Sequence, residues 1–73
     1  NIGGTMITNI VGARIRTIRL SQNISQEKLA LKAELDRTYL ASVESGKRNI
    51  SIVNLEKIIN ALEISFEEFF KNM

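Results

Sequence analysis

The apolar and polar positions in the middle of the chain predict two short helices joined by a tight corner. Leu29 and Ala33 are one helical turn apart, so they lie on one face of the first helix. Leu40 and Val43 mark the inner face of the second helix, and Leu35 falls in the turn between the two. Two helices that pack at a large angle leave the outer face of the second one exposed. That exposed face is the first candidate for a binding surface.

Three further helices are expected around this pair. One is expected from about residue 8 to 21, and the last from residue 66 to about 72. Apolar residues repeat at helical spacing in the first helix and in a fourth one that follows Ser51. They are Val11, Ile15 and Ile18 in the first helix, and Leu55, Ile58, Ile59 and Leu62 in the fourth. We expect the fourth helix, with Phe66 and Phe69, to close the core. Since no strand pattern is present, the fold expected is all-α, a compact five-helix bundle.

Residues that favour helix ends stand at the expected boundaries. Four residues that precede predicted helices can accept a hydrogen bond from the first turn: Ser25, Asp36, Ser51 and Ser65. Gly46 follows the third helix, predicted from Arg37 to Ser45, and offers the left-handed backbone that commonly ends a helix. Gly12 lies inside the first helix. It either costs roughly 1 kcal/mol relative to Ala there or allows another element to pack closely.

The composition is that of one small domain that lacks the side chains of most catalytic sites. The 73 residues include no Cys, His, Pro or Trp, which excludes disulfides, thiolate and imidazole chemistry and the usual zinc sites. No apolar run approaches the roughly 18 residues of a membrane span, and no secretory signal is recognisable. We therefore expect a cytoplasmic protein that is not an enzyme and holds no metal or cofactor. Residues 1–7 are expected to be a flexible leader, with Met6 as the natural start and a cloning remnant before it, and residues 8–73 to be one domain.

Charge is unevenly distributed along the chain. Basic residues outnumber acidic ones from residue 14 to 48, and acidic residues outnumber basic ones from residue 49 onward, although the net charge is only +2. This asymmetry suggests that the first part meets a polyanion and that the last part does not. The alternative is that the charges simply solvate the surface of a small helical protein. The charge pattern alone leaves both interpretations open.

Three segments resemble the XRE-type, phage-repressor-like helix-turn-helix family: SQEKLA at 25–30, VESGKR at 43–48 and LEKIINALEISFEEFF at 55–70. Within that family, DRTYLASVESGKRN at 36–49 is similar to the controller proteins of restriction-modification systems, small dimeric regulators of their own gene and of the endonuclease gene. The resemblance implies a lambda-repressor-like fold that binds double-stranded DNA. Glu34 departs from the family pattern, in which this turn carries glycine. Because a non-glycine residue forced to positive φ costs about 1 kcal/mol, we expect the turn to follow a slightly different path.

The resemblance also places the third helix in the major groove, with its N-terminal residues towards the base edges. Arg37 and Thr38 occupy that end, and Ser42 faces the same side one turn later. An arginine can form a bidentate pair with guanine, and a threonine methyl group can contact the thymine methyl group. Arg48, in the following loop, is implied to reach a base edge. Without the resemblance, each of the three helix residues would be interpreted as a solvated surface residue.

Four further residues are expected to contact the DNA backbone. Gln26 stands at the N-terminus of the second helix, where exposed N–H groups and the helix dipole favour an anion. Tyr39 is expected at a phosphate or at the central sequence, and Lys47 and Asn49 lie in the loop after the third helix. Such contacts position a protein on DNA more than they specify a sequence. The alternative for the loop is a charged turn that is merely exposed.

The family pattern pairs an arginine at the end of the first helix with a glutamate at the end of the third. Arg19 and Glu44 stand at these positions. The resemblance therefore implies a partly buried ion pair that orients the third helix. Its net stabilisation is expected to be near zero, because desolvation offsets the attraction.

The last part of the chain carries more apolar residues than one core face needs. The surplus residues are Val53, Phe70 and Met73. Exposed apolar groups on a short helix often mark an interface, so these residues predict a homodimer. Two-fold pairing would place two reading helices on one side of DNA at roughly 34–36 Å spacing. The alternative is that the last two helices only close the core.

The sequence therefore predicts a transcriptional regulator that binds a pseudo-palindromic operator as a homodimer and controls restriction-modification genes, including its own. The alternative is a protein-interaction module of the same fold, an antitoxin or a peptide-responsive regulator, with secondary DNA binding. The predicted DNA contacts favour the regulator. Neither a membrane nor a small-molecule substrate is indicated as a partner.

Overall fold

Five helices make up the described part of the chain. The computed structural model describes the backbone of residues 2–73 and the side chains of residues 7–73. In chain order the helices are α1 (Ile2–Ser21), α2 (Gln26–Ala33), α3 (Arg37–Glu44), α4 (Ile52–Ala61) and α5 (Phe66–Phe70). This confirms the predicted all-α, five-helix fold. No helix among the described residues is long and apolar enough to cross a lipid bilayer.

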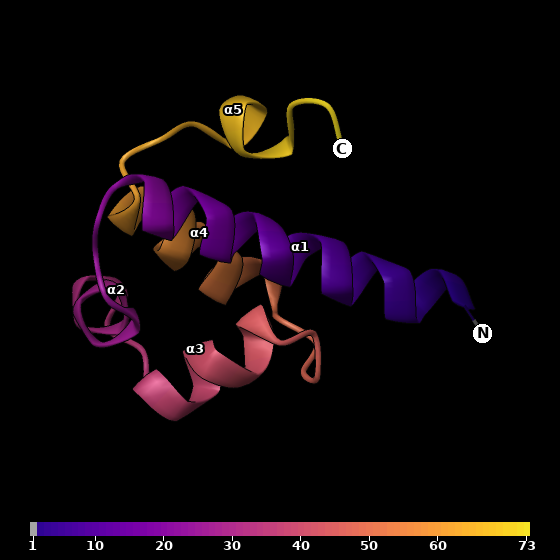
Figure 1. The fold of residues 1–73 in the computed structure, drawn as a ribbon, viewed down its shortest axis with the longest axis horizontal. Helices are drawn as coiled ribbons and strands as arrows, with labels where there is room; N and C mark the ends of the chain where they lie inside the picture. The colour runs from indigo at the N-terminus through magenta and orange to yellow at the C-terminus, as the bar shows by residue number, and fades with distance from the viewer. Residues whose placement is uncertain (1) are drawn as a thin grey trace.

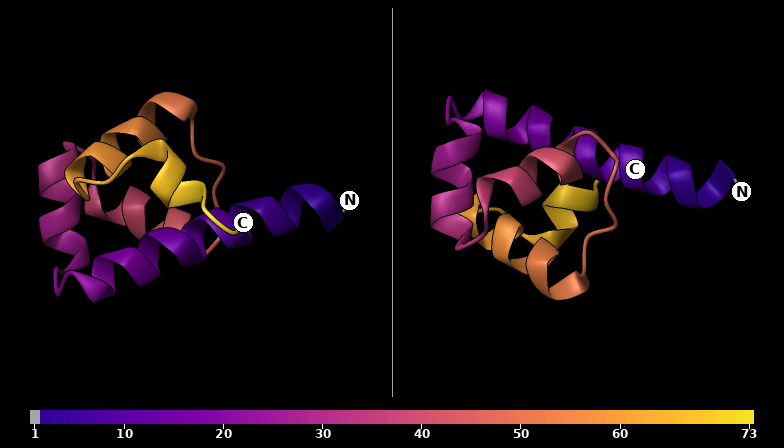
Figure 2. Two further views of the ribbon diagram at one scale, coloured as in Figure 1. Left: turned by 90° about the horizontal axis from the view of Figure 1, so that it is seen from above. Right: turned by 90° about the horizontal axis from the view of Figure 1, so that it is seen from below.

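The long helix α1 organises the arrangement of the others (Figure 1). In that view α2 and α3 lie on one side of α1, and α5 lies on the opposite side (Figure 1). Helix α3 packs against α1 and α2, and α2 also packs against α4. Helices α2 to α5 gather over the C-terminal part of α1 (Figure 2). Residues 36–38, at the N-terminal end of α3, are exposed.

Side chains from all five helices form one core. Its fully buried members include Ile15, Leu29, Leu40, Ile58, Ile59, Leu62 and Phe69. Leu35, in the turn between α2 and α3, packs against them and is partly buried. Phe66 was wrongly predicted to belong to the core, since it is 41% exposed. It is the first residue of α5 and lies at the edge of the bundle, whereas Phe69, one turn later, reaches the centre.

The predicted N-caps are in place. The hydroxyl groups of Ser25, Ser51 and Ser65 each accept a hydrogen bond, at 3.0–3.1 Å, from the backbone N–H three residues later. The Asp36 carboxylate accepts hydrogen bonds of 3.1 and 3.3 Å from two N–H groups in the first turn of α3. Caps of this kind typically stabilise a helix by about 1 kcal/mol. The start of α3 is thus fixed by its own sequence.

Three helix ends differ from the prediction. Helix α1 begins at Ile2, well before the expected residue 8, because a helix once formed gains a hydrogen bond with each residue added. Helices α3 and α5 end slightly earlier than predicted, at Glu44 and Phe70. The side chains of residues 1–6, most of the predicted leader, lie outside the described residues. The natural start at Met6 stays a prediction.

Gly12 in α1 lies against the C-terminal end of α3. A Cβ atom added to it would lie 2.8 Å from the carbonyl oxygen of Glu44 and closer still to that of Val43. This confirms the close-packing interpretation of Gly12. Gly46 has a φ of 81°, the left-handed conformation predicted after α3. The two glycines allow the end of α3 to lie directly against α1.

Glu34 adopts the left-handed conformation itself, with φ 59° and ψ 42°. Its backbone N–H donates to the carbonyl oxygens of Ala30 and Leu31. The N–H of Leu35 donates to the Ala30 carbonyl oxygen at 2.9 Å. The expectation of a different path was therefore wrong. These hydrogen bonds and the packing of Leu35 hold the turn in the conformation that glycine usually supplies.

Replacing Glu34 with glycine is expected to raise the free energy of unfolding by about 0.5–1 kcal/mol, because a residue without Cβ adopts this conformation without steric cost. Urea denaturation followed by circular dichroism measures the change. Glu34→Ala is the matched control, since it removes the exposed carboxylate but keeps Cβ, and it should not give the gain. An unchanged free energy for Glu34→Gly would show that the turn is not strained.

Candidate nucleic-acid interface

The N-terminal turn of α3 presents its side chains to solvent. Arg37 and Thr38 are exposed directly after the Asp36 cap. Ser42, one turn later, is half-buried, and its hydroxyl donates to the carbonyl oxygen of Tyr39 at 2.7 Å. The Ser42 hydroxyl can therefore only accept a further hydrogen bond, whereas a guanidinium such as that of Arg37 offers several donors.

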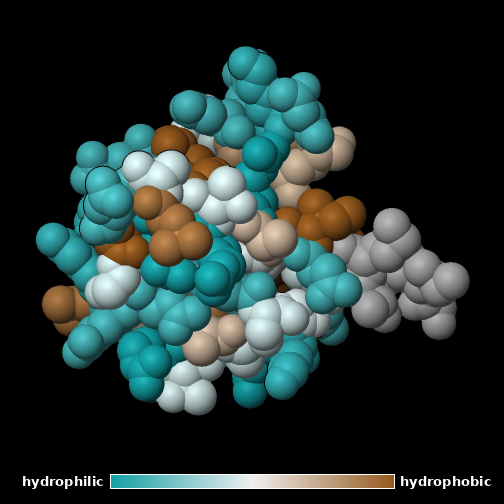
Figure 3. Space-filling view, viewed as in Figure 1, coloured by the Kyte–Doolittle hydropathy of each residue, from teal (hydrophilic) through white to brown (hydrophobic). Residues whose placement is uncertain are grey.

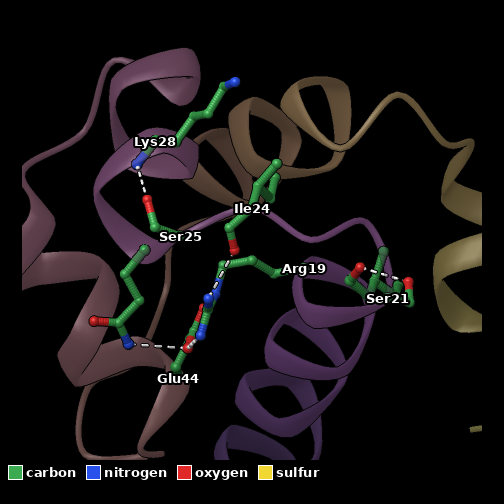
Figure 4. Close-up of polar contacts among 8 residues, drawn as sticks. Arg19, Ser21, Ile24, Ser25, Lys28 and Glu44 are labelled. Atoms are coloured by element: carbon green, nitrogen blue, oxygen red, sulfur yellow. Dashed lines mark hydrogen bonds and ion pairs between the residues drawn. The ribbon is translucent and has the colours of Figure 1, made fainter.

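A buried ion pair connects α1 to the end of α3 (Figure 4). Arg19 Nε donates to Glu44 Oε2 at 2.8 Å, and Arg19 Nη2 donates to Glu44 Oε1 at 3.0 Å. The two side chains are only 7% and 2% exposed. Arg19 Nη1 also donates to the carbonyl oxygen of Ile24 at 2.9 Å. The pair that the family pattern implied is thus present and bidentate, and it fixes the angle between α1 and α3.

Gln26 joins this pair from the N-terminus of α2. Its Nε2 donates to Glu44 Oε1 at 3.0 Å, a bond that the sequence did not predict. An amide nitrogen carries two hydrogens. The second can still be offered to an anion at the N-terminus of α2, where the helix dipole favours negative charge. The structure therefore brings one end of each of α1, α2 and α3 to the same point.

The loop after α3 carries the other predicted DNA contacts. Lys47, Arg48 and Asn49 are all exposed. The guanidinium carbon of Arg48 lies over the Tyr39 ring, 5.2 Å from its centroid, which is within the range of a cation–π contact. The Tyr39 hydroxyl accepts a hydrogen bond of 3.1 Å from Asn54 Nδ2. Sequence reasoning missed Asn54, because the contact joins residues 15 apart on different helices and no local pattern marks it.

Two of the basic residues that make the first part of the chain positive act inside the domain. Arg14 Nε donates to the carbonyl oxygen of Phe69 at 2.9 Å, and Arg14 Nη2 donates to that of Lys71. These carbonyls lie at the C-terminal end of α5. Arg14 therefore caps the C-terminus of α5 and holds that helix against α1. Arg19 is buried in the ion pair. The exposed basic residues that remain for a polyanion in this part of the chain are Arg16, Lys28, Lys32, Arg37, Lys47 and Arg48.

The three residues predicted for a dimer interface are exposed. Val53, Phe70 and Met73 are 60%, 40% and 47% exposed. Phe70 lines an apolar hollow together with residues of α1, α4 and the loop after α3, whereas Met73 lines a separate one against α1. The structure therefore does not bring these two residues into one hollow. Apolar side chains form separate patches among polar ones on the face shown in Figure 3. Ile52, beside Val53, is 81% exposed and was not predicted, although its apolar character at a helix start was visible in the sequence.

Residues 15–69 match the helix-turn-helix family. The control protein C.MunI from Mycoplasma sp is 44% identical over 63 residues, which span 85% of this chain and 85% of that protein. The restriction-modification controller protein C.AhdI from Aeromonas hydrophila has a similar crystal structure, with a TM-score of 0.85 and 42% identity over 89% of this chain and 98% of that one. The controller protein C.Esp1396I, solved as a tetramer in complex with its natural 35 base-pair operator, gives a TM-score of 0.83 and 43% identity over 86% of this chain and 83% of that one.

Proposed function

Because the chain belongs to the helix-turn-helix family and, within it, to the controller proteins of restriction-modification systems, we propose that it binds a pseudo-palindromic operator as a homodimer. It is a DNA-binding transcriptional regulator and not an enzyme. In this proposal it controls restriction-modification genes, including its own, and acts in the cytoplasm, where its DNA lies. The observation that carries the proposal is the exposed N-terminal turn of α3, held at a fixed angle by the buried Arg19–Glu44 pair.

We assign base reading to Arg37 and Thr38, with Ser42 and Arg48 beside them. Arg37 is at the end of α3 that enters the major groove first, and its guanidinium matches the two acceptors of guanine. The Thr38 methyl group suits the thymine methyl group. Ser42, whose hydrogen is already donated within α3, would accept from a base amino group. Arg48 would reach a base edge from the loop.

We assign backbone contacts to Gln26, Tyr39, Lys47 and Asn49. Gln26 combines a free amide hydrogen with the N-terminal dipole of α2. Lys47 and Asn49 are exposed on the loop that leaves α3. The Tyr39 hydroxyl accepts from Asn54 and so can donate its own hydrogen to a phosphate oxygen. These contacts set the register of the protein on DNA, whereas the base-reading residues choose the sequence.

Two-fold assembly is proposed through Val53, Phe70 and Met73. Their exposure supports an interface at the C-terminal helices. The tetramer of C.Esp1396I on its operator supports assembly of more than one copy of this chain on DNA. A dimer joins two weak half-site contacts into one strong complex, because the second contact forms at a high effective concentration.

A protein-interaction module of the same fold is the alternative function. Such a module has no need for exposed cations on α3 and on the loop that follows it, where this chain carries Arg37, Lys47 and Arg48. The similarity to controller proteins over most of the chain also favours the regulator.

DNA affinity is expected to fall steeply as the salt concentration rises, because each phosphate that the protein neutralises releases condensed counterions. Each such phosphate adds about 0.9 to the slope of the logarithm of the binding constant against the logarithm of the salt concentration. Lys47→Ala should flatten that slope by about one unit per subunit and leave the preferred sequence unchanged. Fluorescence anisotropy with labelled duplexes over a range of salt concentrations measures both. Lys57→Ala, which removes the same charge from an exposed position on α4, is the control and should keep the slope. A complex that is insensitive to salt would rule out this docking mode.

A further inference from the structure

A line of contacts runs from α4 through α3 to the loop that follows it. Asn54 Nδ2 donates to the Tyr39 hydroxyl at 3.1 Å. The guanidinium carbon of Arg48 lies over the Tyr39 ring, 5.2 Å from its centroid. Asn54 and Tyr39 are half-buried, whereas Arg48 is exposed. The contacts therefore lead from the packed part of the domain to a cation at its surface.

The hydrogen bond from Asn54 holds the Tyr39 side chain at its far end. The backbone of α3 fixes the Cβ atom of Tyr39, so a hydrogen bond at the hydroxyl restricts rotation of the ring about the side-chain bonds between them. A phenol oxygen can accept one hydrogen bond while it donates another. Because Asn54 supplies the donor, the Tyr39 hydrogen is left for a further acceptor such as a phosphate oxygen.

Arg48 belongs to a segment without helical support. Residues 45–51, between α3 and α4, contain no helical residue. A long arginine side chain in such a segment loses considerable rotamer freedom when it is held in one orientation. A guanidinium held over an aromatic face keeps its N–H edges available for bidentate hydrogen bonds. The Tyr39 ring therefore reduces the freedom of Arg48 without using its donors.

We propose that Asn54 is a positioning residue of the DNA interface: it fixes Tyr39, and Tyr39 holds the Arg48 guanidinium ready for the base edge that it reads. The inference rests on the proposed function, because it requires Arg48 to contact DNA. Asn54 does not touch DNA in this arrangement. It determines how strongly one base is preferred by restricting the side chain that reads it.

The test uses a set of operator duplexes, each with one base pair replaced, based on the operator that the wild-type protein selects from random DNA. Discrimination is the ratio of the affinity for the operator to that for a duplex with one base pair replaced. Asn54→Ala is expected to lower this ratio about two- to fivefold at the base pairs where Arg48→Ala lowers it. At the other base pairs the ratio should stay unchanged. In an Arg48→Ala background, Asn54→Ala should cause no further loss. Asn60→Ala makes the same substitution at an exposed position of α4 and is the matched control.

Tyrosine fluorescence gives a readout without DNA. Tyr39 is the only tyrosine of the chain, and the chain has no tryptophan, so the signal comes from this side chain. Asn54→Ala is expected to change the emission intensity of the free protein, because the Tyr39 ring loses the hydrogen bond that holds it. The change in emission that Arg48→Ala causes should also be smaller in the Asn54→Ala background than in the wild-type protein. Asn60→Ala should leave both unchanged.

Three results would overturn the inference: an unaltered discrimination pattern in Asn54→Ala, an equal loss of affinity for every duplex, or losses that add to those of Arg48→Ala. An equal loss would indicate a role in stability alone. A wild-type protein that binds all duplexes equally would overturn the proposed function, and with it this inference. That outcome is distinct, because it is seen before any variant is compared.

Discussion

The Arg37→Ala variant is expected to bind its operator roughly 30-fold to 10⁴-fold more weakly than the wild-type dimer. A bidentate arginine–guanine pair contributes about 1–3 kcal/mol of discrimination, and a dimer loses two of them. The preference for one base should be lost at one position in each half-site. The affinity for random DNA should fall only by the electrostatic contribution of one positive charge per subunit. Anisotropy titrations with operator and random duplexes measure both losses.

Two controls separate base reading by Arg37 from its charge. Arg37→Lys keeps the charge but not the planar fork of donors, so it should lose the preference and keep the salt dependence. Arg16→Ala removes the same side chain from an exposed position of α1 and should keep the preference. If Arg37→Ala weakens operator and random DNA equally, Arg37 contacts only the backbone and the assignment fails.

The Phe70→Glu variant is expected to dissociate the dimer and to abolish operator binding at low protein concentration. It would place two like charges in an apolar contact where neither can be hydrated or paired well. Each half-site would then have to be filled by an independent monomer, without the high effective concentration that a dimer provides. Sedimentation measures the assembly, and circular dichroism measures the fold.

Phe66→Glu is a matched control for this substitution. Phe66 and Phe70 lie on the same short helix and are 41% and 40% exposed, but only Phe70 is proposed for the interface. Phe66→Glu should therefore stay dimeric. The Phe70 ring also packs edge-on against the buried Phe69, with centroids 5.0 Å apart. An unfolded Phe70→Glu chain would assign Phe70 to the core, and an unchanged dimer would place the interface elsewhere.

The features that depend on near neighbours in the sequence could be predicted. The serine and aspartate caps act within one turn of their own helix, so the starts of α2 to α5 follow from local chemistry. The core positions of α1 to α4 follow from helical spacing for the same reason. The path of the turn at Glu34 was mispredicted because the prediction considered only the local steric cost of a left-handed residue. The packing of Leu35 against the core offsets that cost, and it is not visible in the local sequence.

The features that depend on contacts between distant elements could not be predicted from the pattern. Arg14 was counted as charge for a partner, but it binds carbonyl oxygens at the end of α5. Asn54 is a polar residue in the first turn of α4, and only the fold brings it to Tyr39. The Arg19–Glu44 pair was expected from the resemblance to a family, whereas the bond from Gln26 to the same carboxylate required the structure.

Selection of bound sequences from a pool of random duplexes tests the central claim most directly. The account predicts an inverted repeat whose half-site centres are about one helical turn apart, or 10–10.5 base pairs, with a guanine at a fixed position in each half that disappears when the selection is repeated with Arg37→Ala. The absence of any enriched sequence, or the same enriched sequence for both proteins, would contradict the claim that α3 reads DNA in a two-fold symmetric dimer.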